Sequence, residues 1–260
     1  SRLIGTPNAP VLVDVCIDED FREDPRLVPG SFRHPFRTLH ELAPALTGRK
    51  VVVVCQKGRK LSQGAAAVLR DRGIAAESLE GGIFAWRDAG EAMVPEAKLA
   101  ERNDEGRTVW VTRHRPKIDR IACPWLIRRF VDPNALFLFV SPSEVLNVAG
   151  KFEATPFDVE GVFWSHRGDR CSFDTMIEEF GLVTEPLQRL AAIVRGADTN
   201  RHDLAPEAAG LLAASLGLSR MYRDDLEQLE AGMLLYDAFY RWARDAVDEG
   251  HDWPAASSRS

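Results

Sequence analysis

The chain has 260 residues, with 45% hydrophobic and 28% charged side chains, which is the composition of a globular protein of one or two domains and excludes a disordered one. The net charge of −6 disfavours a nucleic-acid partner. No apolar run approaches the length of a membrane helix, and the valine run 51–54 is strand-sized, so we expect no membrane segment and no secretory leader. Four cysteines without a C-x-x-C pair indicate reduced thiols and a cytoplasmic protein.

The first part of the chain alternates strand and helix patterns. Strands are predicted at 11–15, 50–54 and 75–79, because these short apolar runs are rich in valine or end in turn residues. Helices are predicted over 62–72, which stops at Gly73, and after the Gly81-Gly82 turn. This alternation predicts an α/β domain over residues 1–92, an open parallel sheet with helices on both faces.

Charged and turn-forming residues then replace large apolar ones, which predicts a linker over 93–107. A second, α+β domain is expected over 108–250, with a mainly helical C-terminal part. Its elements are predicted as strands at 109–111, 136–140 and 162–164 and helices at 124–130 and 172–180. The polar residues 251–260 are predicted to form a flexible tail.

A long amphipathic helix is predicted near the end of the second domain. Apolar residues recur there in steps of three and four, at Leu226, Leu229, Met233, Tyr236, Tyr240, Ala243 and Val247. Asp224 and Glu227 form a capping-box pattern at its start. The stripe favours a core-facing helix, and the alternative is the seam of a homodimer.

The first candidate site is a cysteine in a basic loop. Cys55 follows a buried strand, and Lys57, Gly58, Arg59 and Lys60 separate it from the next helix. Nearby cations, the positive end of that helix and loop amides favour thiolate over thiol, and the same cradle would hold a small anion beside the sulfur. A buried, inert cysteine is the alternative.

Two other interpretations concern the same region. A cysteine-based phosphatase needs an arginine six residues after its nucleophile, and residue 61 is leucine. Cys16 follows another strand, where it either accepts sulfur from Cys55 or is a packed thiol.

These residues resemble the rhodanese (sulfurtransferase) family. The likeness extends over residues 1–92 and rests on Leu12-Val13-Asp14-Val15, Val28-Pro29-Gly30-Ser31, the Cys55 loop and Leu79-Glu80-Gly81-Gly82-Ile83-Phe84-Ala85-Trp86. It implies that Cys55 carries a sulfane sulfur as a persulfide and that Lys57 and Lys60 bind an anionic donor such as thiosulfate. It also implies that the backbone amides from Gln56 to Lys60, with Gly58 and Arg59 between them, hold the sulfur, and that no cofactor is required.

The second domain begins with a basic segment. Residues 113–129 carry six Lys or Arg side chains and one acid, the pattern of a solvated face. An oxyanion pocket is the alternative, because Cys123 precedes Pro124 and would then open a helix, with Arg120 beside it. Nucleic-acid binding is the third interpretation, and the acidity of the chain weakens it.

A second histidine and cysteine pair lies further along. His166 and Cys171 flank a short basic turn, and both residue types are ligands of Zn²⁺. A metal ion would need further ligands from Asp119, Asp174, Asp198 or Glu230. The alternative is a hydrogen-bonded turn with an inert cysteine.

From Trp110 to Ala243 the chain resembles the C-terminal domain of ChrB-type chromate-resistance proteins. The segments that carry the likeness are 110–113, 117–129, 165–174 and 193–198. Together, the two resemblances imply sulfur transfer from a small anionic donor to a low-molecular-weight or protein thiol, linked to chromate or oxidative stress. A persulfide or chromate sensor without turnover is the alternative, in which the second domain binds an oxyanion or metal near Arg120, Cys123, His166 and Cys171.

Overall fold

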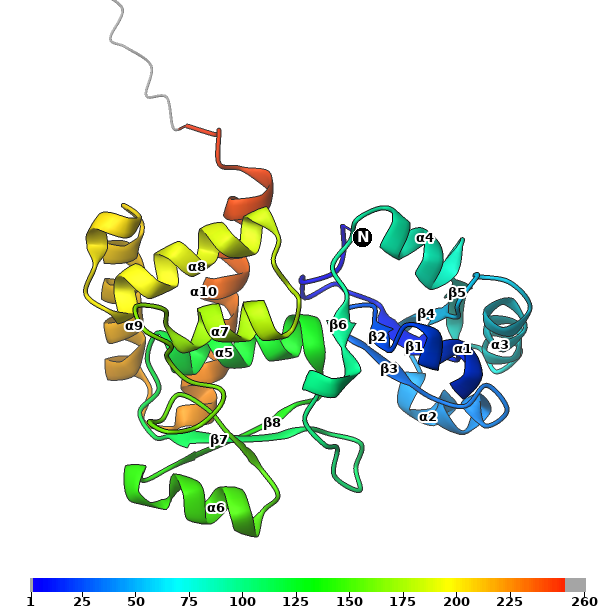
Figure 1. Cartoon of the computed structure of the whole chain (residues 1–260), viewed down its shortest axis with the longest axis horizontal. Helices are drawn as coiled ribbons and strands as arrows, with labels where there is room; N and C mark the ends of the chain where they lie inside the picture. The colour runs from blue at the N-terminus through cyan, green and yellow to red at the C-terminus, as the bar shows by residue number, and fades with distance from the viewer. Residues whose placement is uncertain (1, 251–260) are drawn as a thin grey trace, which may run out of the picture.

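The computed structural model describes residues 2–250, so the tail predicted at 251–260 lies outside the described residues. The chain forms two lobes, each with its own hydrophobic core (Figure 1). The core of the first lobe runs from Leu12 to Met93, and the main core of the second begins at Val94. The lobes touch where the Gly30 amide donates to the Phe130 carbonyl (2.6 Å).

The N-terminal lobe is a parallel sheet surrounded by helices (Figure 1). Its elements are β1 (Val11–Asp14), α1 (Asp18–Glu23), β2 (Arg26–Leu27), β3 (Ser31–Arg33), α2 (Ala43–Leu46), β4 (Lys50–Val54), α3 (Lys60–Asp71), β5 (Ala75–Ser78) and α4 (Gly82–Asp88). The strand order is β3-β1-β4-β5, and every pairing between them is parallel. The predicted parallel α/β sheet is therefore confirmed.

The two central strands are the most apolar ones. Val13 of β1 and Val53 and Val54 of β4 are fully buried, as expected for strands covered on both faces. Their order in the sheet brings the residues after β1 and β4 to the same edge, because parallel strands end on the same side.

The segment predicted as a linker contains regular structure. Met93 and Val94 are buried, and β6 (Val94–Pro95) pairs antiparallel with β2 of the first lobe. A single 3-10 turn, Glu96–Lys98, follows it. The remaining residues lead to the second lobe as an exposed connection.

The second lobe combines a small parallel sheet with a helical bundle (Figure 1). Its elements are β7 (Val109–Arg113), α5 (Asp119–Leu126), β8 (Leu136–Val140), α6 (Val145–Lys151), β9 (Thr155–Pro156), α7 (Ser172–Glu179), α8 (Glu185–Asp198), α9 (Ala208–Met221) and α10 (Asp225–Asp245). The strand order is β8-β7-β9, and both pairings are parallel. This is the predicted sheet followed by a mainly helical part.

Strand β7 separates two layers of the second lobe. Alternate side chains of a strand point to opposite faces. Val109 and Val111 therefore pack with Val145 of α6, whereas Trp110 joins the large core formed with the helices. None of the described helices is long and apolar enough to cross a membrane.

Two local predictions in this lobe are wrong. The helix predicted at 124–130 begins earlier, at Asp119, and continues as a π-helical turn over Ile127–Val131, so Pro124 lies inside it and Cys123 does not open it. The strand predicted at 162–164 is irregular chain with one isolated bridge, Phe157 to Trp164. Trp164 stacks on Phe180 instead (4.6 Å between ring centroids), so packing rather than pairing explains its apolar character.

The predicted amphipathic helix is α10. Five residues of the stripe are buried in the core, namely Leu229, Met233, Tyr236, Tyr240 and Ala243, while Leu226 and Val247 are exposed. The stripe therefore faces the core of its own chain. Asp224 caps the helix by accepting hydrogen bonds from the amides of Leu226 and Glu227 (2.9 Å each).

Candidate functional site

Cys55 lies at the carboxyl end of β4, directly after the last paired residue. Asp14 of β1 pairs with Val54 of β4, and the Val15 amide donates to the Val54 carbonyl (2.8 Å). This register brings Cys16 and Cys55 to the same edge of the sheet. The edge where parallel strands end is the usual ligand-binding edge of an α/β sheet.

The loop after Cys55 is held by the first turn of α4. The Cys55 carbonyl accepts from the Ile83 amide (3.1 Å), and the Gln56 carbonyl accepts from the Phe84 amide (3.1 Å). Gly82 lies so close that an added Cβ would stand 2.1 Å from the Cys55 carbonyl oxygen. The two glycine-containing segments therefore fix each other, and the loop has little freedom to change shape.

A pocket of about 400 Å³ opens above this loop, lined by Asp20, Cys55, Gln56, Lys57, Arg59, Lys60 and Leu61. The three cations are exposed, and Gly58 is buried beneath them. Gln56 donates to Glu23 (2.8 Å), which ties α1 to the loop. All the residues predicted for the first site thus surround one pocket or support its floor.

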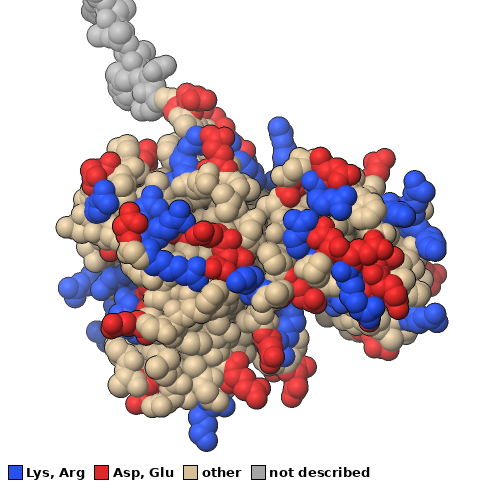
Figure 2. All heavy atoms as spheres, viewed as in Figure 1, with Lys and Arg blue, Asp and Glu red and all other residues tan. Residues whose placement is uncertain are grey.

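The acidic helix α1 borders the same pocket. Asp18, Glu19 and Asp20 form the first turn of α1, and Asp20 lines the cavity. Figure 2 shows red side chains gathered in the N-terminal lobe where Figure 1 places α1. The pocket is therefore of mixed charge, with cations on the loop and a carboxylate on the facing helix.

The two cysteines at this edge differ in their surroundings. The Cys55 residue is 5% exposed, lines the pocket and donates its thiol to the Ser62 hydroxyl (3.1 Å). Burial and the neighbouring Asp14 carboxylate raise the pKa of the Cys16 thiol far above its ordinary value. Cys16 therefore fits the packed-thiol interpretation. That Cys55 is the reactive thiol stays a prediction.

The cysteines of the second lobe are sealed in its core. Cys123 and Cys171 are both 0% exposed, and burial raises the pKa of each well above its ordinary value. Cys171 is the N-cap of α7, where its amide and thiol both donate to Asp174 (3.0 and 3.2 Å). Arg195 of α8 pairs with that carboxylate (2.7 Å). These contacts make Cys171 a structural cap and not a partner of His166.

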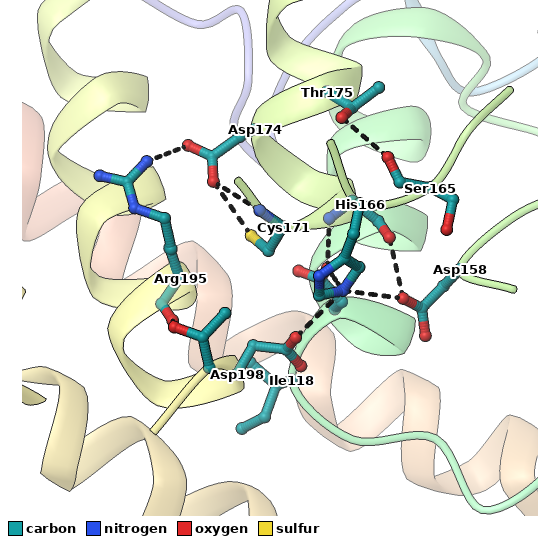
Figure 3. A network of polar contacts seen from close by, with 12 residues as sticks. Ile118, Asp158, Ser165, His166, Cys171, Asp174, Thr175, Arg195 and Asp198 are labelled. Carbon is teal, nitrogen blue, oxygen red and sulfur yellow. Dashed lines mark hydrogen bonds and ion pairs between the residues drawn. The ribbon is translucent and has the colours of Figure 1, made fainter. Parts of the chain in front are cut away.

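His166 lies instead among three aspartates, two of which, Asp158 and Asp198, are labelled in Figure 3. Its Nε2 is 3.5 Å from Asp119 Oδ2, 3.4 Å from Asp158 Oδ1 and 3.3 Å from Asp198 Oδ2. Asp119 is the first residue of α5 and Asp198 the last of α8, while Asp158 and His166 lie in the irregular segment between β9 and α7. We call these four residues the His166 cluster.

Hydrogen bonds from α7 and two arginines hold the cluster in place. The Ser172 amide donates to Asp119 Oδ2 (2.6 Å), and the Ser172 hydroxyl donates to Asp158 Oδ1 (2.8 Å). Arg113 and Arg120 both pair with Asp158 Oδ2, at 2.9 and 3.3 Å. Arg120, predicted for an oxyanion pocket beside Cys123, is therefore brought to Asp158 of this cluster.

Burial and mutual proximity set the charges of the cluster. Burial raises the pKa of Asp119, which is 1% exposed. Hydrogen-bonding proximity to Asp119, Asp158 and Asp198 raises the pKa of His166, so the imidazole carries a proton at neutral pH when no other cation is bound. Although burial opposes it, the neighbouring His166 and hydrogen bonds from Ser172 and Arg113 hold the pKa of Asp158 below its usual range.

The backbone before Asp119 is unusual. Ile118 caps α5 with φ of +46°, a conformation that is strained for a β-branched residue. The Tyr236 hydroxyl donates to the Ile118 carbonyl (3.0 Å), and the Ala122 amide donates to the same oxygen (2.8 Å). The helix and α10 thus fix the position from which Asp119 reaches the cluster.

Sequence reasoning proposed Asp119 and Asp198 as ligands that would complete a site with His166, and the structure brings them together. It missed Asp158, which lies in an irregular segment with no periodic pattern. The other two completing candidates lie elsewhere, since Asp174 pairs with Arg195 and Glu230 pairs with Arg128 (2.5 Å).

Two family models match the chain, one in each lobe. The model of the rhodanese-like domain matches residues 1–89, and the model of the ChrB C-terminal domain matches residues 110–243, just over half of the chain. The chain belongs to the ChrB C-terminal domain family. Its N-terminal lobe is a rhodanese-like domain, as the sequence motifs predicted.

A curated relative agrees with this assignment. Protein ChrB of Cupriavidus metallidurans is 38% identical over 133 residues, which cover 50% of this chain and 39% of that protein. The match therefore spans well under half of the relative's length.

Two solved structures are similar to about a third of the chain. One is a protein of unknown function from Rhodopseudomonas palustris, described as a possible tyrosine phosphatase. It is 31% identical, with a TM-score of 0.29, and the match covers 31% of this chain and 67% of that chain. The other is a rhodanese-like domain of an Anabaena protein. It is 23% identical, with a TM-score of 0.29, and the match covers 33% of this chain and 98% of that chain.

Proposed function

We propose that the N-terminal domain is a sulfurtransferase that moves a sulfane sulfur through a persulfide on Cys55. The observation that carries this proposal is the position of Cys55 in a pocket of about 400 Å³ whose loop bears Lys57, Arg59 and Lys60. A nucleophilic sulfur beside fixed cations suits a small dianionic donor such as thiosulfate.

The reaction has two half-steps. The Cys55 thiolate attacks the outer sulfur of thiosulfate, a new S–S bond forms to Cys55, and the S–S bond of the donor breaks so that sulfite leaves with the electron pair. A nucleophile such as cyanide or a thiolate then attacks the outer sulfur of the persulfide, and Cys55 leaves as thiolate. Sulfite leaves before the acceptor reacts, and the enzyme alternates between its free and persulfide forms, which gives ping-pong kinetics.

The loop residues have separate roles in this proposal. Lys57, Arg59 and Lys60 attract the donor and neutralise the charge that develops on sulfite. The Ser62 hydroxyl accepts a hydrogen bond from the Cys55 thiol (3.1 Å) and orients the sulfur. Asp20 on the facing helix repels a dianion, which limits donor affinity and favours release of sulfite.

We further propose that this chemistry is linked to chromate or oxidative stress. The support is that residues 110–243 match the ChrB C-terminal domain family. We place the protein in the cytoplasm, where low-molecular-weight thiols are available as sulfur acceptors. In a host that lacks its own copy, the full chain is expected to raise chromate tolerance, and Cys55→Ser is expected to remove the gain. Equal tolerance with both forms would separate the resistance from sulfur transfer.

Steady-state thiosulfate:cyanide assays on the full chain test the sulfurtransferase. Cys55→Ser is expected to lower kcat/KM by about a thousandfold or more, because the group that holds the transferred sulfur is gone. Cys171→Ser, a cysteine change in the sealed core, is the matched control and should keep activity. Equal slow rates for wild type and Cys55→Ser would instead favour a sensor that holds a persulfide without turnover. Phosphate release from an aryl phosphate would favour a phosphatase.

A further inference from the structure

We propose that Asp119, His166 and Asp198 bind a divalent transition-metal ion in the second lobe. Each offers one ligand atom, and the three atoms lie within 4.8 Å of one another. The site lies apart from the Cys55 pocket, and the sulfurtransferase proposed above neither needs it nor uses it.

The first argument is that one hydrogen bond does not account for the convergence, since Figure 3 draws contacts from His166 to both Asp158 and Asp198. A single imidazole nitrogen carries at most one proton, which serves one acceptor well. Here three carboxylates approach Nε2 of His166, at 3.3, 3.4 and 3.5 Å, and all three distances exceed the usual N–H···O range of about 2.7–3.2 Å. The arrangement suits a group that several ligands share rather than a proton.

The spacing also fits a metal ion. Ligand atoms about 2.0–2.2 Å from one ion at tetrahedral angles lie about 3.4 Å apart. His166 Nε2 is 3.5 Å from Asp119 Oδ2 and 3.3 Å from Asp198 Oδ2, so these two separations already match, and all three ligand atoms lie within 4.8 Å of one another.

An independent observation comes from Asp119. This residue is 1% exposed, and its Oδ1 accepts no hydrogen bond from any described residue. A buried carboxylate oxygen without a partner is costly. If Asp119 bound the ion through both carboxylate oxygens, the ion would also supply the positive partner that Oδ1 lacks.

The position of Asp198 is a further cost that an ion offsets. Asp198 ends α8, where the helix dipole places partial negative charge, so its carboxylate needs a cation nearby. Protonated His166 fills that role in the unbound state, and a bound ion would take it over. Meanwhile the Ser172 amide at 2.6 Å fixes Asp119 Oδ2 from outside, as supporting residues do around metal ligands.

The remaining carboxylate belongs to the surroundings of the site. Asp158 Oδ2 is occupied by Arg113 and Arg120, and its Oδ1 accepts from Ser172. A pocket of about 560 Å³, lined by Arg113, Asp158 and His166 among others, leads to the cluster. His166 is 40% exposed, so the ion can exchange with solvent.

The ligand set indicates the class of ion. Carboxylates suit Mg²⁺, Ca²⁺ and Mn²⁺, whereas imidazole suits Zn²⁺, Fe²⁺ and other later metals. One imidazole with two carboxylates therefore favours Mn²⁺, Fe²⁺ or Zn²⁺ over Ca²⁺ or Mg²⁺, and the two thiols nearest in sequence, Cys123 and Cys171, are not available as ligands.

Metal titration of the full chain tests the site. Protein purified without a metal-affinity step is stripped with EDTA and titrated with Zn²⁺ and with Mn²⁺ in a calorimeter, and bound Co²⁺ is followed by its visible absorption. We expect one equivalent to bind, and a millimolar excess of Mg²⁺ should not displace it. His166→Ala and Asp198→Asn should each weaken binding by about a hundredfold or more.

Matched controls lie next to the site. His202 and Asp203 are exposed, so His202→Ala and Asp203→Asn should bind the ions as wild type does. Circular dichroism and the melting temperature of stripped protein show whether each variant folds, and Asp198→Asn keeps the shape of a half-buried side chain. Absence of stoichiometric binding to folded wild-type protein would overturn the proposal. So would binding that survives in folded Asp198→Asn and His166→Ala.

Discussion

Two segments of the chain look alike in sequence and differ in structure. Cys55 and Cys171 each stand with basic residues and a glycine between a strand-like run and a helix. In the first segment the cysteine comes before the loop, so its sulfur lies at the end of β4 beside the pocket. In the second it comes after the loop, as the N-cap of α7, and is sealed in the core.

The basic residues of the two segments also differ in what they can bind. Arg167 and Arg170 pair with Glu179 and Glu178 at the end of α7, at 2.5 and 2.6 Å. Lys57, Arg59 and Lys60 instead surround the pocket beside Cys55. A cysteine with neighbouring cations in the sequence therefore indicates a reactive site only when the sulfur and the cations line the same pocket.

Equivalent glycine changes in the two loops should break one segment and spare the other. Gly58 and Gly168 have nearly the same backbone, with φ of +63° and +62°. A Cβ on Gly58 would lie 2.3 Å from the Leu79 carbonyl oxygen, whereas a Cβ on Gly168 would meet nothing within 4 Å. Gly58→Ala should cost about 2–4 kcal/mol of unfolding free energy and most of the activity. Gly168→Ala should cost about 1 kcal/mol, for the left-handed backbone alone.

Urea unfolding and the thiosulfate assay measure both effects. Gly64→Ala serves as a control for glycine replacement in general, because its Cβ would meet nothing and alanine favours the α3 helix. Equal losses of stability and activity for Gly58→Ala and Gly168→Ala would mean that the close packing of the Cys55 loop contributes to neither.

Charge changes around the first pocket should move donor affinity in opposite directions. Lys57→Ala removes a loop cation and should raise the KM for thiosulfate about three- to tenfold. Asp20→Asn removes the facing carboxylate and should lower it about two- to threefold. Lys50→Ala, at the far end of β4, is the matched control and should change little. Added salt should shrink both shifts, and equal KM values for all four proteins would remove the electrostatic role of the loop.

The smallest effect is expected at the sealed cysteine. Serine is a good N-cap, so Cys171→Ser should keep the contact with Asp174 and change stability by about 1 kcal/mol or less. Its sulfur-transfer activity should match wild type within about twofold, since the residue does not reach the Cys55 pocket. A large loss of transfer would mean that the two lobes act as one catalytic unit.

The sequence predicted the N-terminal fold well because its strands are continuous apolar runs. The valines of β4 leave no other assignment, and the position of Cys55 follows from the end of that strand. By contrast, β2, β6 and β9 have two residues each, too few for any period to appear. Pro124 was misleading because proline is most common in the first turn of a helix, whereas here Asp119 begins the helix.

The second site depends on contacts that no local pattern records. Asp119, Asp158, His166 and Asp198 lie on separate elements, and only the packing of α5, α7 and α8 brings them together. Sequence spacing suggested the His166 and Cys171 pair, which the structure separates because the Cys171 thiol turns to Asp174. The sequence can therefore name distant residues as candidate ligands, but only the folded structure shows which of them lie together.

The central claim is that Cys55 carries the transferred sulfur. The most direct measurement is mass spectrometry of the full chain after reaction with thiosulfate in the absence of an acceptor, with peptide mapping of the added mass. We expect one sulfur atom on Cys55, with Cys16, Cys123 and Cys171 unmodified, and its loss on addition of cyanide. A chain that gains no sulfur, or one that carries it on another cysteine, would contradict the account.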